Sequence, residues 1–327
     1  MTRLNSIRIK MMAPIVALAL ILIGLFIFMF TMNQWQSHAR QIQSEHYFEA
    51  ISEVLNADRD IYQARLAQQK MFSGQGTEEE NRQDYLDNAQ QVNERFKSYR
   101  RYLQDEPELL TDFENFDQLY EEWLSASEKL LTSTSASLFI SKEFLSLDEK
   151  FMTIRHMLDM AGENLREHTR RLTEQGRADD ITDYVESMVE VLNADRDLYQ
   201  ARLALQEYMD GASTQQQTVE LFEENAEQVI MRFNTYRNYL QGEPQLIEDY
   251  ENFDVLFNEW LHESRAFFKS PAMGEKVELP ADLVVADEKF SAIRKVLDKA
   301  GEKVRTHARN MEAEMDDPYL LIYDKKI

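Results

Sequence analysis

The chain has few of the residues that interrupt helices and none that form disulfides. Its 327 residues include 9 Gly, 6 Pro and no Cys. Because turns and sheet edges depend on Gly and Pro, their scarcity predicts an almost entirely helical, all-α fold. The absence of Cys excludes disulfides and thiol chemistry, so an extracytoplasmic chain of this composition would have to rely on packing alone.

Positive charge is also scarce. The chain has 36 Lys and Arg against 59 Asp and Glu, which gives a formal net charge of −23. Phosphate binding needs a basic surface, so this balance argues against nucleic acid as a partner. A solvated, self-repelling surface on long helices accounts for the acidity. An acidic cleft for cationic compounds is the alternative.

One long uncharged run, over residues 13–32, stands near the N-terminus. A helix of about 20 residues covers roughly 30 Å, the thickness of a bilayer core. Arg3, Arg8 and Lys10 precede this run, so the positive-inside rule predicts a cytoplasmic stub over 1–12 and an extracytoplasmic remainder. We prefer an uncleaved anchor to a cleaved signal peptide, because the run is longer than an h-region and no small-residue cleavage site follows. No second such run follows, and the tail over 316–327 holds only a short apolar patch.

The most informative feature is a tandem repeat. The sequence Leu-Asn-Ala-Asp-Arg-Asp-x-Tyr-Gln-Ala-Arg-Leu-Ala occupies 55–67 and returns, with one difference at x, over 192–204. Other blocks recur in the same order, such as Glu-Asn-Phe-Asp and Asp-Glu-Lys-Phe. Matched blocks in one order indicate the duplication of a whole module. We therefore expect a first helical repeat over 33–177 and a second over 178–315.

Apolar residues recur at helical spacing through both repeats, with breaks at glycines, prolines and serine-rich stretches. The expected helical segments are 34–73, 78–105, 107–134, 142–175, 179–210, 213–241, 244–268 and 282–315. We expect two stacked four-helix bundles after one transmembrane helix. We prefer six helices, in which the glycines near 74–76 only kink a long helix and each bundle borrows a segment from the other repeat. Eight shorter antiparallel helices in two self-contained bundles also fit.

The N-terminal anchor, the duplicated helices and the repeated motif together give the chain a resemblance to a known family. It resembles the helical bimodular sensor domain of bacterial methyl-accepting chemotaxis proteins over about residues 1–315. The resemblance implies a homodimer, a small-molecule ligand (often an organic acid) between helices, and a helix displacement that signals through the inner membrane. The chain departs from the family by lacking the second span and the methylated cytoplasmic hairpin, so it is either cut short or an anchored module with its bulk in the periplasm.

Two repeated arginines are the strongest candidates for ligand contact. Arg59 and Arg196 lie on or beside the apolar stripes of their helices, and a guanidinium there must be paired. One interpretation is a structural pair with Asp58 or Asp195, and the other is a fork for a ligand carboxylate. In the swapped arrangement each motif meets arginines of the other repeat. The predicted sites are Asn56, Arg59 and Tyr62 with Arg232, Arg237 and Arg294, and Asn193, Arg196 and Tyr199 with Arg95, Arg100 and Arg155.

Catalytic and metal-binding patterns are weak. His168 and His307 match between the repeats but are expected on the surface. Glu259 and His262 have the Glu-x-x-His spacing found in di-iron helical bundles. The matching position of the first repeat is Ser125, so the spacing does not recur. No nucleophile–histidine–acid pattern or phosphate loop is present. We therefore expect no enzyme, no metal and no cofactor.

The sequence thus predicts the extracytoplasmic sensing region of a chemoreceptor-like signal transducer that binds a small molecule, most simply a carboxylate. One alternative is a sensor-kinase module that reads a periplasmic binding protein. The other is a truncated receptor that acts only through dimerisation. Inward arginines without acidic partners would favour the small molecule, whereas a satisfied polar core beside a large exposed apolar patch would favour a protein partner.

Overall fold

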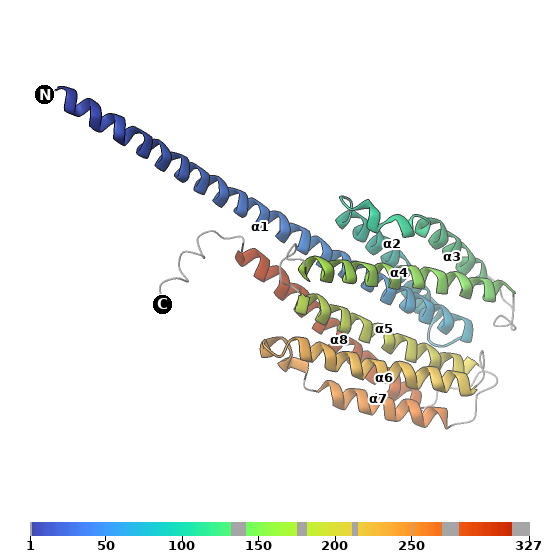
Figure 1. Ribbon diagram of the computed structural model, residues 1–327. Helices are drawn as coiled ribbons and strands as arrows, with labels where there is room; N and C mark the ends of the chain where they lie inside the picture. Colours follow the sequence, from blue (N-terminus) through green and yellow to red (C-terminus); the bar gives the residue numbers. More distant parts are fainter. Residues whose placement is uncertain are drawn as a thin grey trace.

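The chain folds as a set of long helices (Figure 1). The computed structural model describes residues 2–131, 142–174, 182–210, 215–250, 252–269 and 281–315. These residues form helices and turns without any strand, which confirms the all-α class. The helices are α1 (Thr2–Ser73), α2 (Glu78–Tyr102), α3 (Phe116–Leu131), α4 (Lys142–Glu174), α5 (Thr182–Asp210), α6 (Gln215–Tyr239), α7 (Phe253–Phe268) and α8 (Ala281–Met315).

Helix α1 is one uninterrupted helix of 72 residues. Its first part, Pro14–Trp35, has a mean hydropathy of 2.9 and none of it is buried against the rest of the chain. By length and composition this segment can cross a membrane. The same helix then enters the folded core, where nearly every side chain from Tyr47 to Gln69 is buried.

The end of α1 is a turn and not a kink. Gly74 and Gly76 have φ angles of 69° and 68°, a left-handed conformation that glycine adopts without strain. Thr77 then caps the next helix, since its Oγ1 accepts a hydrogen bond from the Glu80 amide at 3.3 Å. Helix α2 therefore folds back along α1. The six-helix prediction is wrong, and over the described residues the chain has the eight helices of the alternative.

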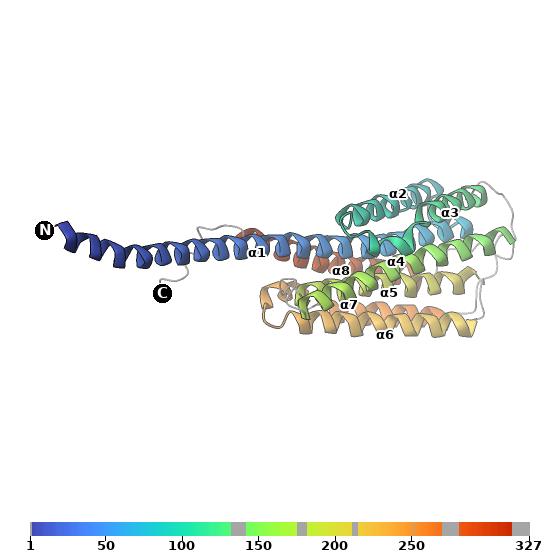
Figure 2. The ribbon, with the colours of Figure 1, turned by 45° about the horizontal axis from the view of Figure 1, so that its top comes forward.

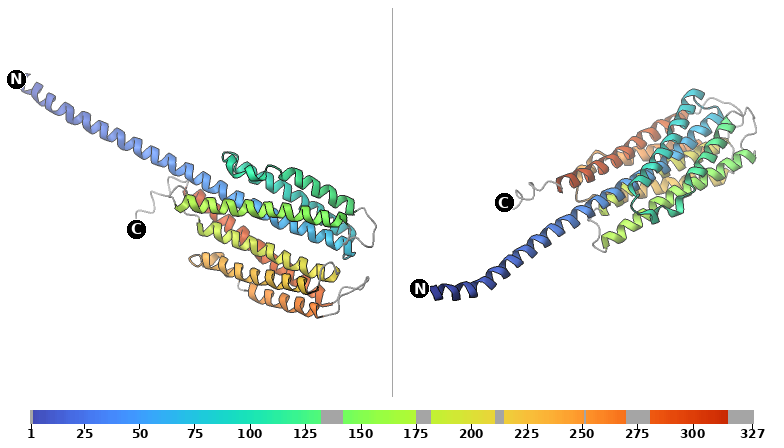
Figure 3. Two further views of the ribbon diagram at one scale, coloured as in Figure 1. Left: turned by 45° about the vertical axis from the view of Figure 1, so that its right-hand side comes forward. Right: turned by 90° about the horizontal axis from the view of Figure 1, so that it is seen from above.

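The helices pack within their own repeats. Helices α1–α4 contact one another, as do α5–α8, and the two groups meet mainly where α1 lies against α5 (Figure 2). The predicted exchange of segments between repeats is wrong, because α1 packs on α2 and not on α6. The two groups lie side by side, with α1 and α5 at the centre (Figure 3). An end-to-end stacking of the bundles is not what the described residues form.

Helices α3 and α7 begin later in the chain than the sequence predicts. Two short 3₁₀ turns, Pro107–Leu109 and Thr111–Phe113, precede α3, and Pro244–Leu246 with Glu248–Tyr250 precede α7 in the same way. Aromatic side chains then fill the space behind these turns. The rings of Phe96 and Phe116 stack at 3.6 Å, and those of Phe233 and Phe253 at 3.7 Å. Trp123 and Trp260 are fully buried behind them.

Several predicted features lie outside the described residues. They are the breaks at 133–141, 176–179, 211–213 and 270–280 and the tail 316–327.

Candidate functional site

The Asp-Arg-Asp triplet of the repeated motif lies where α1 and α5 face each other. Its six side chains are all at least nine-tenths buried. We call them, with two residues each from α4 and α8, the ionic layer. Its members are Asp58, Arg59 and Asp60 of α1, Asp195, Arg196 and Asp197 of α5, Arg155 and Asp159 of α4, and Arg294 and Asp298 of α8. Because α1 and α5 are surrounded by other helices, polar motif residues that would face solvent on an outer helix are enclosed here.

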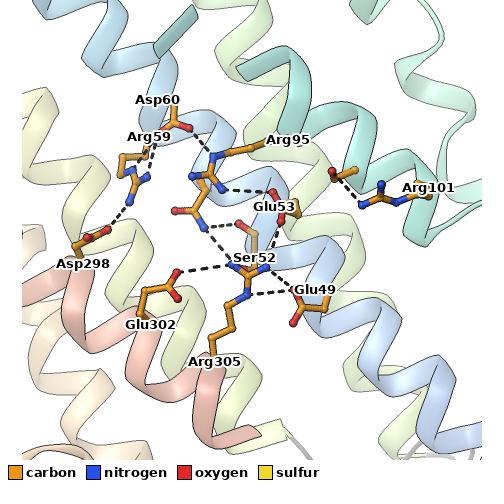
Figure 4. Close-up of polar contacts among 12 residues, drawn as sticks. Glu49, Ser52, Glu53, Arg59, Asp60, Arg95, Arg101, Asp298, Glu302 and Arg305 are labelled. Carbon is orange, nitrogen blue, oxygen red and sulfur yellow. Dashed lines mark hydrogen bonds and ion pairs between the residues drawn. The ribbon is translucent and has the colours of Figure 1, made fainter. Parts of the chain in front are cut away.

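Arg59 joins both repeats. Its guanidinium lies 3.0 Å from Asp60 on α1, 2.9 Å from Asp298 on α8 and 3.8 Å from Asp195 on α5. Burial opposes a charge at this position, yet these acids raise the pKa of Arg59 above its ordinary value. Figure 4 shows the side chain reaching from α1 towards α8. Arg59 is therefore a fully paired cation that crosses the boundary between the repeats.

Arg196 repeats this arrangement in the opposite direction. It lies 3.1 Å from Asp197 on its own helix, 2.7 Å from Asp159 on α4 and 3.4 Å from Asp58 on α1. Its pKa is raised in the same way, with burial opposing the charge and Asp197 favouring it. Each repeat thus sends one arginine into an acidic pair on the other repeat.

Four members of the ionic layer, Asp58, Asp195, Arg155 and Arg294, have a buried side-chain atom without a hydrogen-bond partner. Asp58 Oδ1 and both carboxylate oxygens of Asp195 are buried without a hydrogen-bond partner. Burial raises the pKa of each to about 6, and nearby arginines only partly offset it. Asp58 Oδ2 accepts one long hydrogen bond from Arg196 at 3.4 Å, whereas Asp195 is held by charge alone at 3.6 Å or more. The ionic layer is therefore balanced in charge but incompletely hydrogen-bonded.

The flanking arginines bind the layer to the second helix of each repeat. Arg95 of α2 donates to Asp60 at 2.6 Å and to Glu53 at 3.3 Å. Arg232 of α6 makes the matching bonds to Asp197 and Glu190 at the same two distances. A further link lies on α1 and α8, where Arg305 pairs with Glu49 at 2.5 Å and with Glu53 at 3.2 Å (Figure 4).

The structure brings together only part of each predicted site. Arg59 and Arg294 share Asp195, and Arg196 and Arg155 share Asp159. The other predicted arginines are elsewhere because each repeat packs on itself: Arg95 and Arg232 serve their own repeats. Arg100 and Arg237 lie near the ends of α2 and α6. Arg100 donates to the Phe113 carbonyl at 2.9 Å and pairs with Asp117. Arg237 donates to the Tyr250 carbonyl at 3.0 Å and pairs with Asp254.

The remaining motif residues have structural contacts. Asn56 donates to the Ser52 carbonyl at 2.8 Å, and Asn193, its counterpart, is buried. Tyr62 packs edge-to-face on Phe151, and Tyr199 packs in the same way on Phe290. The Arg294 guanidinium also lies 5.1 Å from the Tyr199 ring centroid, a cation–π geometry.

Two polar groups were missed by sequence reasoning. Tyr47, Glu106 and His168 meet in the first repeat, and Tyr184, Glu243 and His307 meet in the second. Both histidines, which the sequence places on the surface, are partly exposed, with side chains 22% and 26% exposed. Their match between the repeats was the available signal.

Comparison with known proteins gives no relative: the chain matches no protein-family model, no curated protein and no solved structure. Among the residues that the structure describes, no three His, Cys, Asp or Glu side chains are grouped to hold a metal. Function must therefore be argued from the geometry.

Proposed function

We propose that the chain is the extracytoplasmic sensing region of a membrane-anchored signal transducer of the chemoreceptor type. The continuity of α1 carries this proposal, because one helix joins an apolar segment of membrane-spanning length to the buried ionic layer. A helix of this kind transmits displacement along its axis without an intervening hinge. The stub before the segment would then be cytoplasmic and the two repeats periplasmic.

Helix α8 supplies the second element that such a transducer needs. It runs back towards the end of the folded region from which α1 projects (Figure 1). Arg59–Asp298 and Arg305–Glu49 tie it to α1 at two levels. A ligand that shifts one repeat against the other would change these links, by an amount set by its differential affinity for the two states. Relative motion of α1 and α8 would be the output.

The proposed ligand is a small carboxylate. Every arginine of the ionic layer has an acidic partner, so a ligand carboxylate must replace a resident one. A ligand carboxylate would most easily take over the arginine contacts of Asp58 and Asp195. Asp58 Oδ1 and both Asp195 oxygens lack a hydrogen bond, whereas a ligand could bond in two places to a guanidinium fork.

Replacing the competing aspartate tests this idea. Asp58→Asn and Asp195→Asn remove one resident carboxylate each, so a ligand that binds there should raise the melting temperature more in these variants than in the wild type. The measurement is thermal unfolding of the full chain in nanodiscs against a panel of organic acids, with Asp117→Asn as the control at an outer arginine. No shift by any acid in any variant would reject the carboxylate ligand.

A protein partner is the second candidate. The observation in its favour is that each of the four arginines of the ionic layer already has an acidic partner. Outside α1 the exposed large apolar side chains are scattered over several helices, so the surface does not single out one docking face. Binding of a periplasmic solute-binding protein to the nanodisc-held chain, without any response to free acids, would support this candidate.

A further inference from the structure

Helix α4 carries sulfur and imidazole groups along its outer face. Met152, His156 and Met160 follow one another at intervals of four residues, so they lie on one side of the helix. Met152 and Met160 are 49% and 37% exposed, and His156 is exposed between them. We call these three residues the methionine–histidine stripe. The stripe presents two thioethers and one imidazole to solvent.

The matching helix of the second repeat, α8, has no such groups on its outer face. Hydroxyl and ammonium groups stand at the three corresponding positions, Ser291, Lys295 and Lys299, all of them exposed. The buried positions are kept, as Phe151 of α4 and Phe290 of α8 show. The fold therefore accepts polar residues on this face, and packing does not require the thioethers and the imidazole of α4.

Helix geometry brings the three groups within reach of one ion. Residues four apart on a helix have Cβ atoms about 5–6 Å apart, and His156 stands midway between the two methionines. Helical side chains lean towards the N-terminus, so Met160 covers the turn of His156, and the imidazole covers the turn of Met152. A methionine has three rotatable bonds, which let each sulfur approach an ion held by the imidazole.

The groups around the stripe leave it open to a cation. His156 makes no hydrogen bond or ion pair with any residue that the structure describes. The nearby basic side chains are engaged, since Lys150 bonds to an acid of α3 at 2.5 Å and Arg155 pairs with Asp159 at 3.6 Å. Glu149 is exposed one turn before Met152. The corresponding face of α8, with its two lysines, would repel a cation.

We propose that the methionine–histidine stripe binds one soft monovalent metal ion, Cu(I) or its analogue Ag(I), through two thioether sulfurs and one imidazole nitrogen. Thioether ligands select Cu(I), whereas Zn²⁺ is bound by thiolate, imidazole and carboxylate groups. The expectation of no metal rested on patterns of carboxylates, cysteines and histidines, which thioether ligands do not follow. This inference does not depend on which molecule the proposed sensing region binds.

Binding also has a defined place in the fold. All three ligands are neutral when they coordinate, so the bound ion adds one positive charge to the outer face of α4. The inner face of the same helix carries Asp159, which pairs with Arg196 of α5. The ion would therefore hold together two turns of the helix that supports one half of the ionic layer.

The test is a titration of the full chain in nanodiscs with Ag(I), which shares the ligand preference of Cu(I) without its oxidation. Methionine methyl NMR in chloride-free buffer follows the sulfurs, with Met152→Leu and Met160→Leu to assign the signals. We expect the methyl signals of Met152 and Met160 to shift together and to saturate at one ion per chain. Met231, which is exposed on α6 away from any such stripe, should respond only at higher Ag(I).

Affinity measured by calorimetry on the same samples tests the ligand set. His156→Gln, and Met152→Leu together with Met160→Leu, should each weaken Ag(I) binding at least about tenfold. The matched controls, Met231→Leu and His262→Gln at an exposed position of α7, should leave it unchanged. All of these positions are exposed, so the variants should fold, and circular dichroism checks this.

The proposal is overturned if the Met152 and Met160 signals do not move at one equivalent of Ag(I), or if His156→Gln binds Ag(I) as tightly as the wild type. Saturation of the same residues by Zn²⁺ at the same concentration would overturn the assignment to a soft ion.

Discussion

The two repeats share the ion pairs of the ionic layer and differ on their surfaces. Arg95 meets Asp60 at 2.6 Å, and Arg232 meets Asp197 at the same distance. On the outside, α4 exposes Met152 and Met160 where the matching positions of α8 are Ser291 and Lys299. The difference teaches which contacts the fold requires: a buried charge must keep its partner, because an unpaired one costs several kcal/mol, whereas an exposed position is free to change.

A second difference lies in how closely helices approach. A side chain at Gly162 would place its Cβ 2.9 Å from Leu55, whereas one at Gly301 would lie 3.4 Å from Leu192. At this position α4 therefore lies closer to the Leu55 side chain of α1 than α8 lies to the Leu192 side chain of α5. The first repeat carries the long N-terminal extension of α1, so the tighter contact lies on the helix that would connect to the membrane.

The largest effect is expected where the interior contacts are the same. Asp60→Asn and Asp197→Asn each remove the carboxylate that two arginines share. Because a buried guanidinium loses one of its acidic partners and a second guanidinium loses a charged hydrogen bond, each variant should lower the free energy of unfolding by about 2–4 kcal/mol. Urea unfolding of the full chain in nanodiscs measures this. If one variant is harmless and the other severe, the two halves of the ionic layer are not equivalent.

The next effect is a dependence on pH. Burial raises the pKa of Asp58 and Asp195 from 3.8 to about 6, so the folded state binds these protons more tightly than the unfolded state. The free energy of unfolding should therefore fall as the pH rises from about 4 to about 6 and then level off, by up to roughly 3 kcal/mol for each group.

Urea unfolding at pH 4, 5, 6 and 7 follows this fall. Asp58→Asn and Asp195→Asn should each remove about half of it, and a fall that survives in the double variant would contradict the assignment to these residues.

A smaller effect separates the two glycines. Gly162→Ala forces Leu55 to move within a packed core, which should cost about 1–2 kcal/mol. Gly301→Ala makes an ordinary contact and gains helix propensity, so it should be neutral or stabilising by up to about 1 kcal/mol. Melting temperatures of the two variants measure this difference. Equal losses would show that the two helix contacts are equally tight.

The smallest effect belongs to the outer arginine pairs. The carboxylates of Asp117 and Asp254 are about half exposed, so Asp117→Asn and Asp254→Asn should each cost less than about 1 kcal/mol. They are matched controls for Asp60→Asn and Asp197→Asn, since all four remove an arginine partner. A loss as large as that from the buried pair would mean that exposure does not set the strength of these contacts.

The sequence was sufficient for the helices, the duplication and the burial of Arg59 and Arg196, because each is a local or periodic signal. It was insufficient for the packing partners. Whether Gly74 and Gly76 kink the helix or end it depends on their φ angles, which are positive in the structure. Glycine adopts both the helical and the left-handed conformation, so the sequence does not decide between them. That choice decided whether Arg59 would face arginines of the other repeat or, as found, acids such as Asp298.

The grouping of Tyr47, Glu106 and His168, and of its counterpart in the second repeat, could not be predicted from the sequence for a related reason. Glu106 stands in a turn with no periodicity, and its contact with His168 depends on the packing of α4 against α1. The match of His168 with His307 was visible, but a repeated histidine on a helix does not reveal its partner.

The central claim is that two self-packed repeats behave as one unit because Arg59 and Arg196 cross between them. The most direct measurement is ¹⁹F NMR of the fluorotryptophan-labelled full chain during thermal unfolding, since Trp123 and Trp260 are buried in different repeats. The account predicts that their folded signals disappear at the same temperature. It also predicts that Arg59→Met together with Arg196→Met separates the two transitions. Two transitions several degrees apart in the wild type would contradict the account.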